Sequence, residues 1–432
     1  MRLNWFSPLP PERTDIAHYT ARLAPALMRR FDVVFWTDLR ADAQVLPAGA
    51  SVQIFDAKRI EERAINRQLL CGLNVYNFGN DARFHAGIFQ VAKRIPGFAV
   101  LHDTRLHGFV FELYRHAEPR WGGYLDLARE LYGEGGEAKA RQIVACEGRT
   151  IDQSVEDMPF IEPVVDNAIA AVCHTRMACA DIRARSDVPI LTLPLPFVSL
   201  AEKPAVSREW APPWRFVMFG YVNSNRRLES VIRALAELRG RVDFNLDIFG
   251  TLWDQPLIEG VIARTDLSSC VRVHGFAPEE KLDAAIASAH LAFNLRYPTM
   301  GEASGGILRS WAHATPALVT NVGWYADLPD QVALKVSVEN EIADIQRGVL
   351  KLAERPRDFE TMGRAAQVWL SEAHSPVAYV DGLADALADM PRLMTRYAGR
   401  RMLQRVAAVS RSKAERRVML DRAVDIILPL FT

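Results

Sequence analysis

The sequence predicts an α/β protein with two doubly wound Rossmann-like domains that face a cleft. Three observations predict it: a length of 432 residues, short apolar runs that alternate with helical patterns, and a proline-rich break midway along the chain. A chain of this length exceeds one ordinary hydrophobic core, so we expect at least two domains. The alternation runs once on each side of the break, which predicts two similar domains.

The first half of the chain carries short apolar runs that are separated by helical patterns. Several runs are apolar on both faces, as the strands of a covered parallel sheet must be. The expected strands are Leu3–Phe6, Val33–Thr37, Val52–Phe55, Leu73–Phe78, Phe98–His102, Ile169–His174 and Ile190–Leu193. Helical patterns occupy Ile16–Arg30 and Ala86–Ile95. We expect residues 1–196 to form the first domain, with a polar, glycine-rich helical insertion at about 115–165.

The break lies at residues 194–214, where five prolines stand among polar residues. Such a density of proline suits an interdomain linker. These prolines are Pro194, Pro196, Pro204, Pro212 and Pro213. The strands expected after the break are Phe216–Phe219, Phe244–Phe249, Val271–His274, Leu291–Leu295 and Ala317–Thr320. We expect residues 197–375 to form the second domain and residues 376–432 to form basic helices that pack back across the domains. The cleft between two such domains is the expected ligand site.

The overall composition is that of a soluble globular protein, and it excludes several classes. Basic and acidic residues number 52 each, so the formal net charge is zero, which gives no support for nucleic-acid binding. The five cysteines are scattered without zinc-site or thioredoxin spacing, which indicates a reduced, cytoplasmic compartment. No run approaches roughly 18 apolar residues, so we expect no membrane-spanning helix. The first residues also lack the apolar core of a signal peptide.

Candidate ligand-binding residues are most concentrated in the segment Arg296–Ser310, between an expected strand and an expected helix. Ser304, Gly305 and Gly306 form a small-residue loop where the helix begins, and free backbone N–H groups and the helix dipole favour phosphate there. Glu302 stands just before this loop. Because a carboxylate beside an anion is unfavourable unless it binds something else, sugar hydroxyls are its natural partners. An ordinary helix cap with a solvated Glu302 is the alternative.

This segment resembles the donor-site motif of the family-four retaining glycosyltransferases, which have the two-domain GT-B fold. In that motif a glutamate precedes a small Ser-Gly loop, and a second glutamate often comes after it. Glu302 matches the first glutamate, whereas Ser310 stands at the position of the second. The run Pro316–Asp330 is also similar to a bacterial branch that commonly lacks the second glutamate. The resemblance covers roughly residues 1–375.

The resemblance implies roles for further residues of the second domain. Arg226 and Arg227 lie where the family places a basic residue that neutralises the donor pyrophosphate, and a solvated helix start is the alternative. Together with Glu302 they are the expected catalytic residues of this domain. The expected donor-binding residues are Gly220, Asn225, Gly250, Ser304, Gly305, Gly306, Ile307 and Ser310.

The first domain also carries residues that resemble the family. The proline-rich stretch before the first expected helix is similar to the acceptor-side loop, with Thr14 and Asp15 where a small residue and a glycine are common. In related enzymes a histidine near His102 contacts the transferred sugar, so His102 is the expected catalytic residue of this domain, and a structural histidine at a strand end is the alternative. The expected acceptor-side residues are Thr14, Asp15, His18, Tyr19, Asn80, His85 and Asp103.

These features together predict a retaining, metal-independent glycosyltransferase. It would move a sugar from a nucleotide-diphosphate sugar to a hydroxyl of a glycan or glycolipid acceptor in bacterial surface polysaccharide synthesis. We expect no cofactor beyond the nucleotide sugar, which is a co-substrate. Two rivals stay open: a non-catalytic sugar-nucleotide-binding subunit of a glycan assembly complex, and a GT-B-type sugar-nucleotide epimerase. Ser310 and Asp15, which depart from the family pattern, motivate the first rival.

The segment 392–422 is strongly basic. It holds ten basic and two acidic residues, a local net charge of 10 − 2 = +8, with apolar residues interleaved at helical spacing. A basic amphipathic helix favours anionic membrane surfaces, so one interpretation is a peripheral contact with the inner face of the plasma membrane. The other is that these helices pack across the two domains while their arginines face water.

Overall fold

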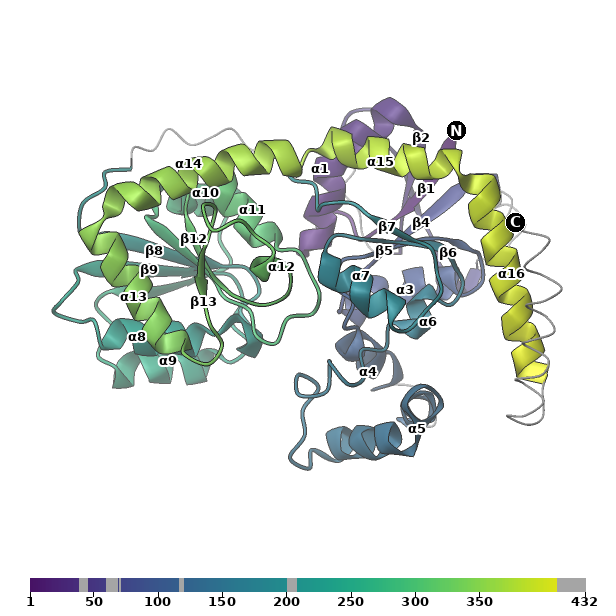
Figure 1. Ribbon diagram of the computed structural model, residues 1–432, viewed down its shortest axis with the longest axis horizontal. Coiled ribbons are helices and arrows are strands. Elements are labelled where there is room, and N and C mark those ends of the chain that lie inside the picture. The colour runs from purple at the N-terminus through teal and green to yellow at the C-terminus, as the bar shows by residue number, and fades with distance from the viewer. Residues whose placement is uncertain (39–45, 60–68, 70, 116–119, 200–207, 410–432) are drawn as a thin grey trace. The chain divides into compact units, whose positions relative to one another are not determined.

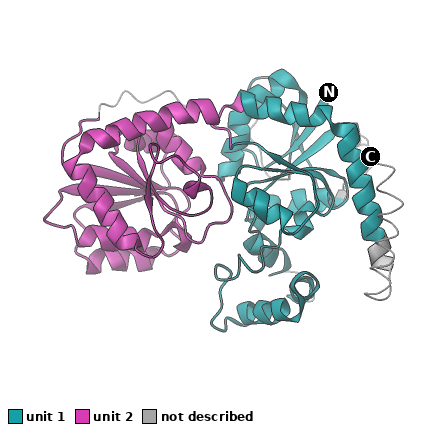
Figure 2. Ribbon diagram, viewed as in Figure 1, with its two compact units in different colours: residues 1–194, 377–432 teal, residues 195–376 magenta. Residues whose placement is uncertain are grey.

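The computed structural model describes the chain except for residues 39–45, 60–68, 70, 116–119, 200–207 and 410–432. Predictions for Pro204 and for the basic side chains beyond residue 409 therefore lie outside the described residues. Two compact units make up the chain, residues 1–194 with 377–432 and residues 195–376 (Figure 2). The predicted boundaries were 196 and 375. The C-terminal segment belongs to the first unit.

The first unit contains a seven-stranded parallel sheet in the order β3-β2-β1-β4-β5-β6-β7 (Figure 1). Its strands are β1 (Arg2–Phe6), β2 (Asp32–Thr37), β3 (Ser51–Ile54), β4 (Leu73–Phe78), β5 (Gly97–Leu101), β6 (Ala168–Cys173) and β7 (Ile190–Thr192). Every residue of β4, β5 and β6 is buried, which explains the unbroken apolar runs of β5 and β6. The order of the strands across the sheet reverses between β1 and β4, although all of these strands run parallel to one another.

Helices connect these strands and carry the predicted insertion. They are α1 (Asp15–Arg30), η2 (Ala57–Arg59), α3 (Ala82–Ala92), α4 (His107–Arg115), α5 (Gly122–Ala145), α6 (Glu162–Val165) and α7 (Arg176–Arg183), joined near the C-terminus by α15 (Pro376–Ala388) and α16 (Met390–Val409). Tyr124 of α5 and Phe160 after it are fully buried in the same apolar cluster as Tyr76 and Leu101 of the sheet. The described part of the insertion is thus packed onto the core of the first unit.

The described part of the basic segment forms α16, which contacts the first unit. The Tyr397 hydroxyl donates to the Asn167 side chain at 2.7 Å, and Arg401 pairs with Asp166 at 3.1 Å. The Arg400 guanidinium donates to the carbonyl of Ala168, the first residue of β6. Two of the basic side chains therefore anchor the helix. Among the described residues, no helix has both the length and the apolar character that crossing a membrane requires.

The second unit contains a six-stranded parallel sheet in the order β10-β9-β8-β11-β12-β13. Its strands are β8 (Trp214–Phe219), β9 (Phe244–Phe249), β10 (Val271–Gly275), β11 (Leu291–Asn294), β12 (Ala317–Thr320) and β13 (Leu334–Val336). The three-residue β13 was not predicted, because it is too short and too exposed to give an apolar run. The strand order reverses between β8 and β11, and ligands of open parallel sheets bind beyond the carboxyl ends of the strands at such a reversal.

Helices cover both faces of this second sheet. They are η3 (Ser224–Arg226), α8 (Leu228–Ala236), α9 (Gln255–Arg264), α10 (Glu279–Ser288), α11 (Gly305–Ala312), α12 (Gly323–Ala326), α13 (Glu341–Glu354) and α14 (Pro356–Ala373). Helices α8, α9 and α13 lie together on one face, and α10, α11 and α14 lie over the other (Figure 1). The loops after β8 and β11 meet at the carboxyl edge of the sheet, where the candidate site begins.

Candidate functional site

The start of α11 presents free backbone N–H groups at this edge. Ser304 is the N-cap, and its hydroxyl oxygen accepts from the Ile307 N–H at 3.3 Å. The N–H groups of Gly305 and Gly306 occupy the first helical positions, which have no partner within a helix. A β-carbon added to Gly305 would meet no atom within 4 Å, so this backbone borders open space. The helix start can therefore receive an anion.

Asn294, the last residue of β11, connects this helix start to Arg226. Its amide nitrogen donates to the Ser304 hydroxyl at 3.2 Å, and its oxygen accepts from Arg226 Nη1 at 3.3 Å. Arg226 Nη2 donates to the Phe219 carbonyl at 2.8 Å, and the side chain is buried. A positive charge thus lies beside the helix start. We did not predict Asn294, although one amide inside the apolar run of an expected strand is a usable signal.

Arg227 does not share the partners of Arg226 and pairs with Glu341 instead. Its Nε lies 3.0 Å from both carboxylate oxygens of Glu341, at the start of α13, and its Nη2 lies 2.8 Å from one of them. Arg227 has a positive φ of 60°, and this left-handed turn directs its side chain away from that of Arg226. Both arginines were predicted to hold the diphosphate; Arg227 pairs with Glu341, whereas Arg226 lies beside the start of α11.

Glu302 lies in the loop before α11 and is 7% exposed. Its Oε2 accepts from the Thr299 hydroxyl at 2.9 Å and from the Met300 N–H at 2.6 Å, and its Oε1 lies 2.8 Å from Arg296 Nε. The carboxylate thus holds the loop that leads into α11. Arg296 begins the motif segment, but the sequence indicated no role for it, because its partner is set by the fold of the loop.

Asn225 of η3 also holds this loop. Its amide nitrogen donates to the Pro298 carbonyl at 3.2 Å, and its backbone carbonyl accepts from the Tyr297 N–H at 2.7 Å. The side chain is buried. The loops after β8 and β11 are therefore fixed to each other, which keeps Arg226 and the start of α11 in one place.

Two glycines shape the edge where β8 and β9 end. Gly220 and Gly250 have φ values of +106° and +110°, and a β-carbon on Gly250 would lie 1.9 Å from the Gly220 carbonyl oxygen. Only glycine permits this approach, which leaves a backbone edge without side chains.

The side chains of Ile307 and Ser310, two residues also predicted to bind the donor, are fully buried. The Ser310 hydroxyl donates to the Gly306 carbonyl at 3.2 Å. Neither side chain is therefore exposed at this edge.

His102 comes directly after β5 in the first unit and lies in a cluster of rings. Its Nε2 is 3.2 Å from the Asn77 side-chain oxygen. The ring of Tyr19 meets it edge-on at 4.6 Å between centroids, and the His174 ring lies at 5.0 Å. Burial, and after it the nearby imidazoles of His174 and His85, holds the pKa of His102 well below its ordinary value of 6.5. The imidazole is therefore neutral near pH 7.

Three further predicted residues meet next to His102. Asp103 accepts from the Asn80 N–H at 2.9 Å, and the Asn80 side-chain oxygen accepts from the Phe109 N–H at 2.8 Å. His85 Nδ1 lies 3.0 Å from the Asn77 carbonyl oxygen, and burial lowers the pKa of His85 to about 4. The carboxyl ends of β4 and β5 thus gather amide, carboxylate and neutral imidazole groups.

The first turn of α1 holds the remaining predicted residues. Thr14 is the N-cap and accepts from the Ile16 N–H at 3.4 Å, Asp15 is exposed, and His18 is half-buried. The Tyr19 hydroxyl donates to that of Tyr379 in α15 at 2.9 Å, and both side chains are buried. Tyr19 was predicted to lie on the acceptor side, and its hydroxyl joins α1 to α15.

The described residues contain no group of three or more His, Cys, Asp or Glu side chains that could hold a metal ion. The chemistry at the two edges differs in charge. The edge of the second unit offers a helix start and a buried arginine, which suit an anion. The edge of the first unit offers neutral and acidic groups, which suit hydroxyl groups.

Comparisons with known proteins agree with this architecture. No protein-family model and no curated protein matches the chain. HepE of Anabaena, solved with UDP-glucose, aligns with a TM-score of 0.59 and 12% identity over 90% of this chain and 100% of that chain. WaaG, a glycosyltransferase involved in lipopolysaccharide biosynthesis, aligns with a TM-score of 0.56 and 15% identity over 90% and 99%. A glycosyltransferase from Rickettsia africae aligns with a TM-score of 0.59 and 11% identity over 91% and 98%. The chain thus has the two-domain GT-B fold of glycosyltransferases.

Proposed function

We propose that the protein is a retaining glycosyltransferase. It transfers a sugar from a nucleotide-diphosphate sugar to a hydroxyl of a glycan or glycolipid acceptor, in bacterial surface polysaccharide synthesis on the cytoplasmic side. The observation that carries the proposal is the open start of α11 beside the buried Arg226, at the strand reversal of the second sheet. The sequence motif and the fold support the same activity. The sugar nucleotide seen with HepE makes UDP-glucose the first donor to test.

The second unit binds the donor diphosphate in this proposal. The N–H groups of Gly305 and Gly306 and the guanidinium of Arg226 stabilise the charge that grows on the leaving diphosphate. Each charge-assisted hydrogen bond contributes about 1.5–3 kcal/mol. Glu302 keeps the loop before α11 in place and orients the donor sugar. No cofactor takes part.

The first unit binds the acceptor, and transfer proceeds on the front face of the sugar. The bond between the anomeric carbon and the phosphate oxygen breaks as the acceptor hydroxyl oxygen bonds to the same carbon. The acceptor proton passes to the leaving phosphate, so configuration is retained and no protein nucleophile is needed. The neutral His102 donates or accepts one hydrogen bond with the transferred sugar, while Asn80 and Asp103 position the acceptor.

A transfer assay with anomeric analysis tests the proposal. The protein is incubated with a panel of nucleotide sugars, first UDP-glucose, and a mixture of glycan and glycolipid acceptors. Nucleotide release is measured, and proton NMR reads the anomeric configuration of the product. Transfer with retention is the expected result. Inversion contradicts the retaining mechanism, conversion of the free donor to an epimer indicates the epimerase rival, and donor binding without turnover indicates the non-catalytic subunit.

A lipid-linked acceptor would make membrane attachment useful, and the basic C-terminal segment is where we propose it occurs. In α16 the side chains of Arg392, Met394, Arg396 and Met402 are exposed. Each basic residue near an anionic surface contributes about 1 kcal/mol. The intact chain should co-sediment with anionic but not neutral vesicles, less so in high salt, and a chain truncated after residue 390 should not. Equal sedimentation of both chains, or of neither, contradicts the attachment.

A further inference from the structure

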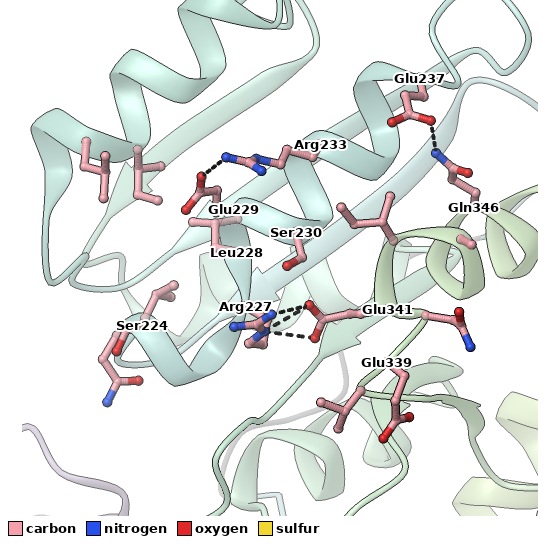
Figure 3. A pocket seen from close by; sticks show the side chains of 18 of the residues that line it. Ser224, Arg227, Leu228, Glu229, Ser230, Arg233, Glu237, Glu339, Glu341 and Gln346 are labelled. Carbon is pink, nitrogen blue, oxygen red and sulfur yellow. Dashed lines mark hydrogen bonds and ion pairs between the residues drawn. The ribbon is translucent and has the colours of Figure 1, made fainter. Parts of the chain in front are cut away.

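A pocket of about 750 Å³ lies in the second unit between α8, α9 and the residues that lead into α13 (Figure 3). Its lining includes Arg227, Ser230, Trp253, Glu339, Asn340 and Glu341. We propose that this pocket binds a neutral carbohydrate, as a holding site for a glycan. No residue of the Glu302 loop or of α11 lines it. The inference therefore goes beyond the proposed transfer, which occurs at the other loops of this edge.

Trp253 provides an aromatic platform in this pocket. Its side chain is 50% exposed, whereas its backbone is fixed, because its N–H donates to the Val222 carbonyl at 3.0 Å. The next residue, Asp254, caps α9 by accepting from the Leu257 N–H at 2.9 Å. A half-exposed indole on a fixed loop offers a flat apolar surface at little entropic cost. The C–H face of a pyranose ring fits such a surface.

The charges of the pocket exclude an anionic ligand. Four carboxylates line it against two arginines, which leaves a formal charge of 2 − 4 = −2. Figure 3 shows both arginines already paired, Arg227 with Glu341 at 2.8 Å and Arg233 with Glu229 at 2.6 Å. A phosphate would meet neutralised arginines and unpaired negative charge, so electrostatics disfavour it. A neutral polyol carries no such cost.

Hydrogen-bonding groups complete the recognition of a sugar. The side chains of Glu339 and Asn340 are exposed on the loop before α13, and the Asn340 side chain makes no capping hydrogen bond to this helix. A carboxylate accepts two or more hydrogen bonds, and an amide both donates and accepts, which matches vicinal hydroxyl groups. The pocket volume lies within the range of small-ligand sites, roughly 300–1,000 Å³. An aromatic face with adjacent carboxylate and amide groups is thus a fit for a mono- or disaccharide unit.

The test uses the full-length protein on an array of neutral oligosaccharides from one to four residues long, and then saturation-transfer NMR with the saccharides that bind. Trp253→Ala should weaken binding at least tenfold, and Glu339→Gln should weaken it less. Val368→Ala removes an exposed apolar side chain of α14 outside the pocket and should leave binding unchanged. Thermal unfolding of each variant shows that the fold is kept.

The proposal is overturned by no binding on the array, by binding that survives Trp253→Ala, or by binding that free UDP displaces. The last would place the sugar at the donor edge. A 6-phosphorylated form of the bound sugar should bind more weakly than the neutral form, and stronger binding also overturns the proposal. Nucleotide binding by Trp253→Ala should equal that of the wild type. If the full-length protein binds the saccharide but transfers no sugar, the proposed function is refuted and the proposed holding site is not.

Discussion

The starts of α1 and α11 are built alike and differ in the residue next to the cap. Each helix begins at a hydroxyl N-cap, Thr14 in the first unit and Ser304 in the second. The residue after the cap is the exposed Asp15 in α1, whereas two glycines, Gly305 and Gly306, come after it in α11. An aspartate in the first turn complements the helix dipole and stabilises the helix. It also occupies the positive end that an anion would need.

Under the proposed function, this difference suits the second unit to the donor diphosphate and the first unit to the acceptor. The first two residues of α11 are glycines and its first turn carries no acidic side chain, so the N–H groups of Gly305 and Gly306 stay available for phosphate. In α1 the positive end of the helix dipole instead interacts with the carboxylate of Asp15. A glycosyltransferase needs one diphosphate site and one site for a neutral hydroxyl. The two helix starts therefore predict the donor at α11 and the acceptor near α1.

The largest effect should come from giving α11 the aspartate of α1. In Gly305→Asp the new carboxylate would stand at the proposed diphosphate site, and like charges about 4 Å apart repel by about 4 kcal/mol at an effective dielectric constant of 20. We expect nucleoside-diphosphate affinity to fall at least a hundredfold in titration calorimetry. Gly305→Asn is the matched control, because the site has room for a side chain. Equal losses in both variants would rule out electrostatics as the cause.

The two adjacent arginines should differ by the next largest effect. Arg226→Gln should weaken UDP binding by about 1.5–3 kcal/mol, roughly ten- to hundredfold, because it removes a charge beside the helix start. Arg227→Gln should leave UDP affinity nearly unchanged, since Glu341 already pairs with Arg227. Calorimetry measures both, and Arg226→Lys, which keeps the charge, should recover part of the loss. A larger loss from Arg227→Gln than from Arg226→Gln would contradict the division of roles.

The loop before α11 should show a smaller effect on transfer. Glu302→Gln should slow transfer about tenfold or more, as loss of a charged hydrogen bond is worth at least about 1.5 kcal/mol. Arg296→Gln breaks the same ion pair without touching the proposed sugar contact. Steady-state kinetics compares the two. Identical losses would mean that Glu302 acts only by holding the loop, and an unchanged rate in Glu302→Gln would remove it from the site.

Acid sensitivity should show the smallest effect. The pKa of His85 is lowered to about 4 in the folded protein and is near 6.5 when unfolded. The unfolded chain therefore binds more protons between these values, and the free energy of unfolding falls as the pH drops from 6.5 towards 4. His85→Gln should reduce this dependence by up to about 1.4 kcal/mol per pH unit. Urea unfolding at pH 7.5 and 5.0 measures it, with His290→Gln as the matched change in the second unit. An unaltered slope in His85→Gln would contradict the expectation.

The sequence predicted best those strands that are buried on both faces, such as β5 and β6. The apolar runs of β5 and β6 can be recognised without tertiary information, whereas the short, half-exposed β13 has no such run. The role of Ser304 as the N-cap of α11 could be predicted, because capping depends on residues that are close in sequence. The ion pair between Arg227 and Glu341 could not be predicted, since Glu341 lies 114 residues further along the chain.

Side-chain direction was the other limit of the sequence. The position of Ser310 in the motif suggests a donor contact, but its hydroxyl satisfies a carbonyl of its own helix. Tyr19 stands in the acceptor-side stretch, yet its hydroxyl bonds to Tyr379. Local patterns predict where a residue lies in an element, and packing against distant elements decides which way it points.

The first unit is assembled from both ends of the chain, and this bears on how the protein is made. A ribosome releases residues 1–194 first, but α15, which bonds to α1 through Tyr379, emerges only after the whole of residues 195–376. Domains fold as units as they leave the ribosome. The second unit is continuous in sequence, so it is the first to have all of its parts. The N-terminal sheet therefore lacks α15 and α16 until the whole of the second unit has been synthesised.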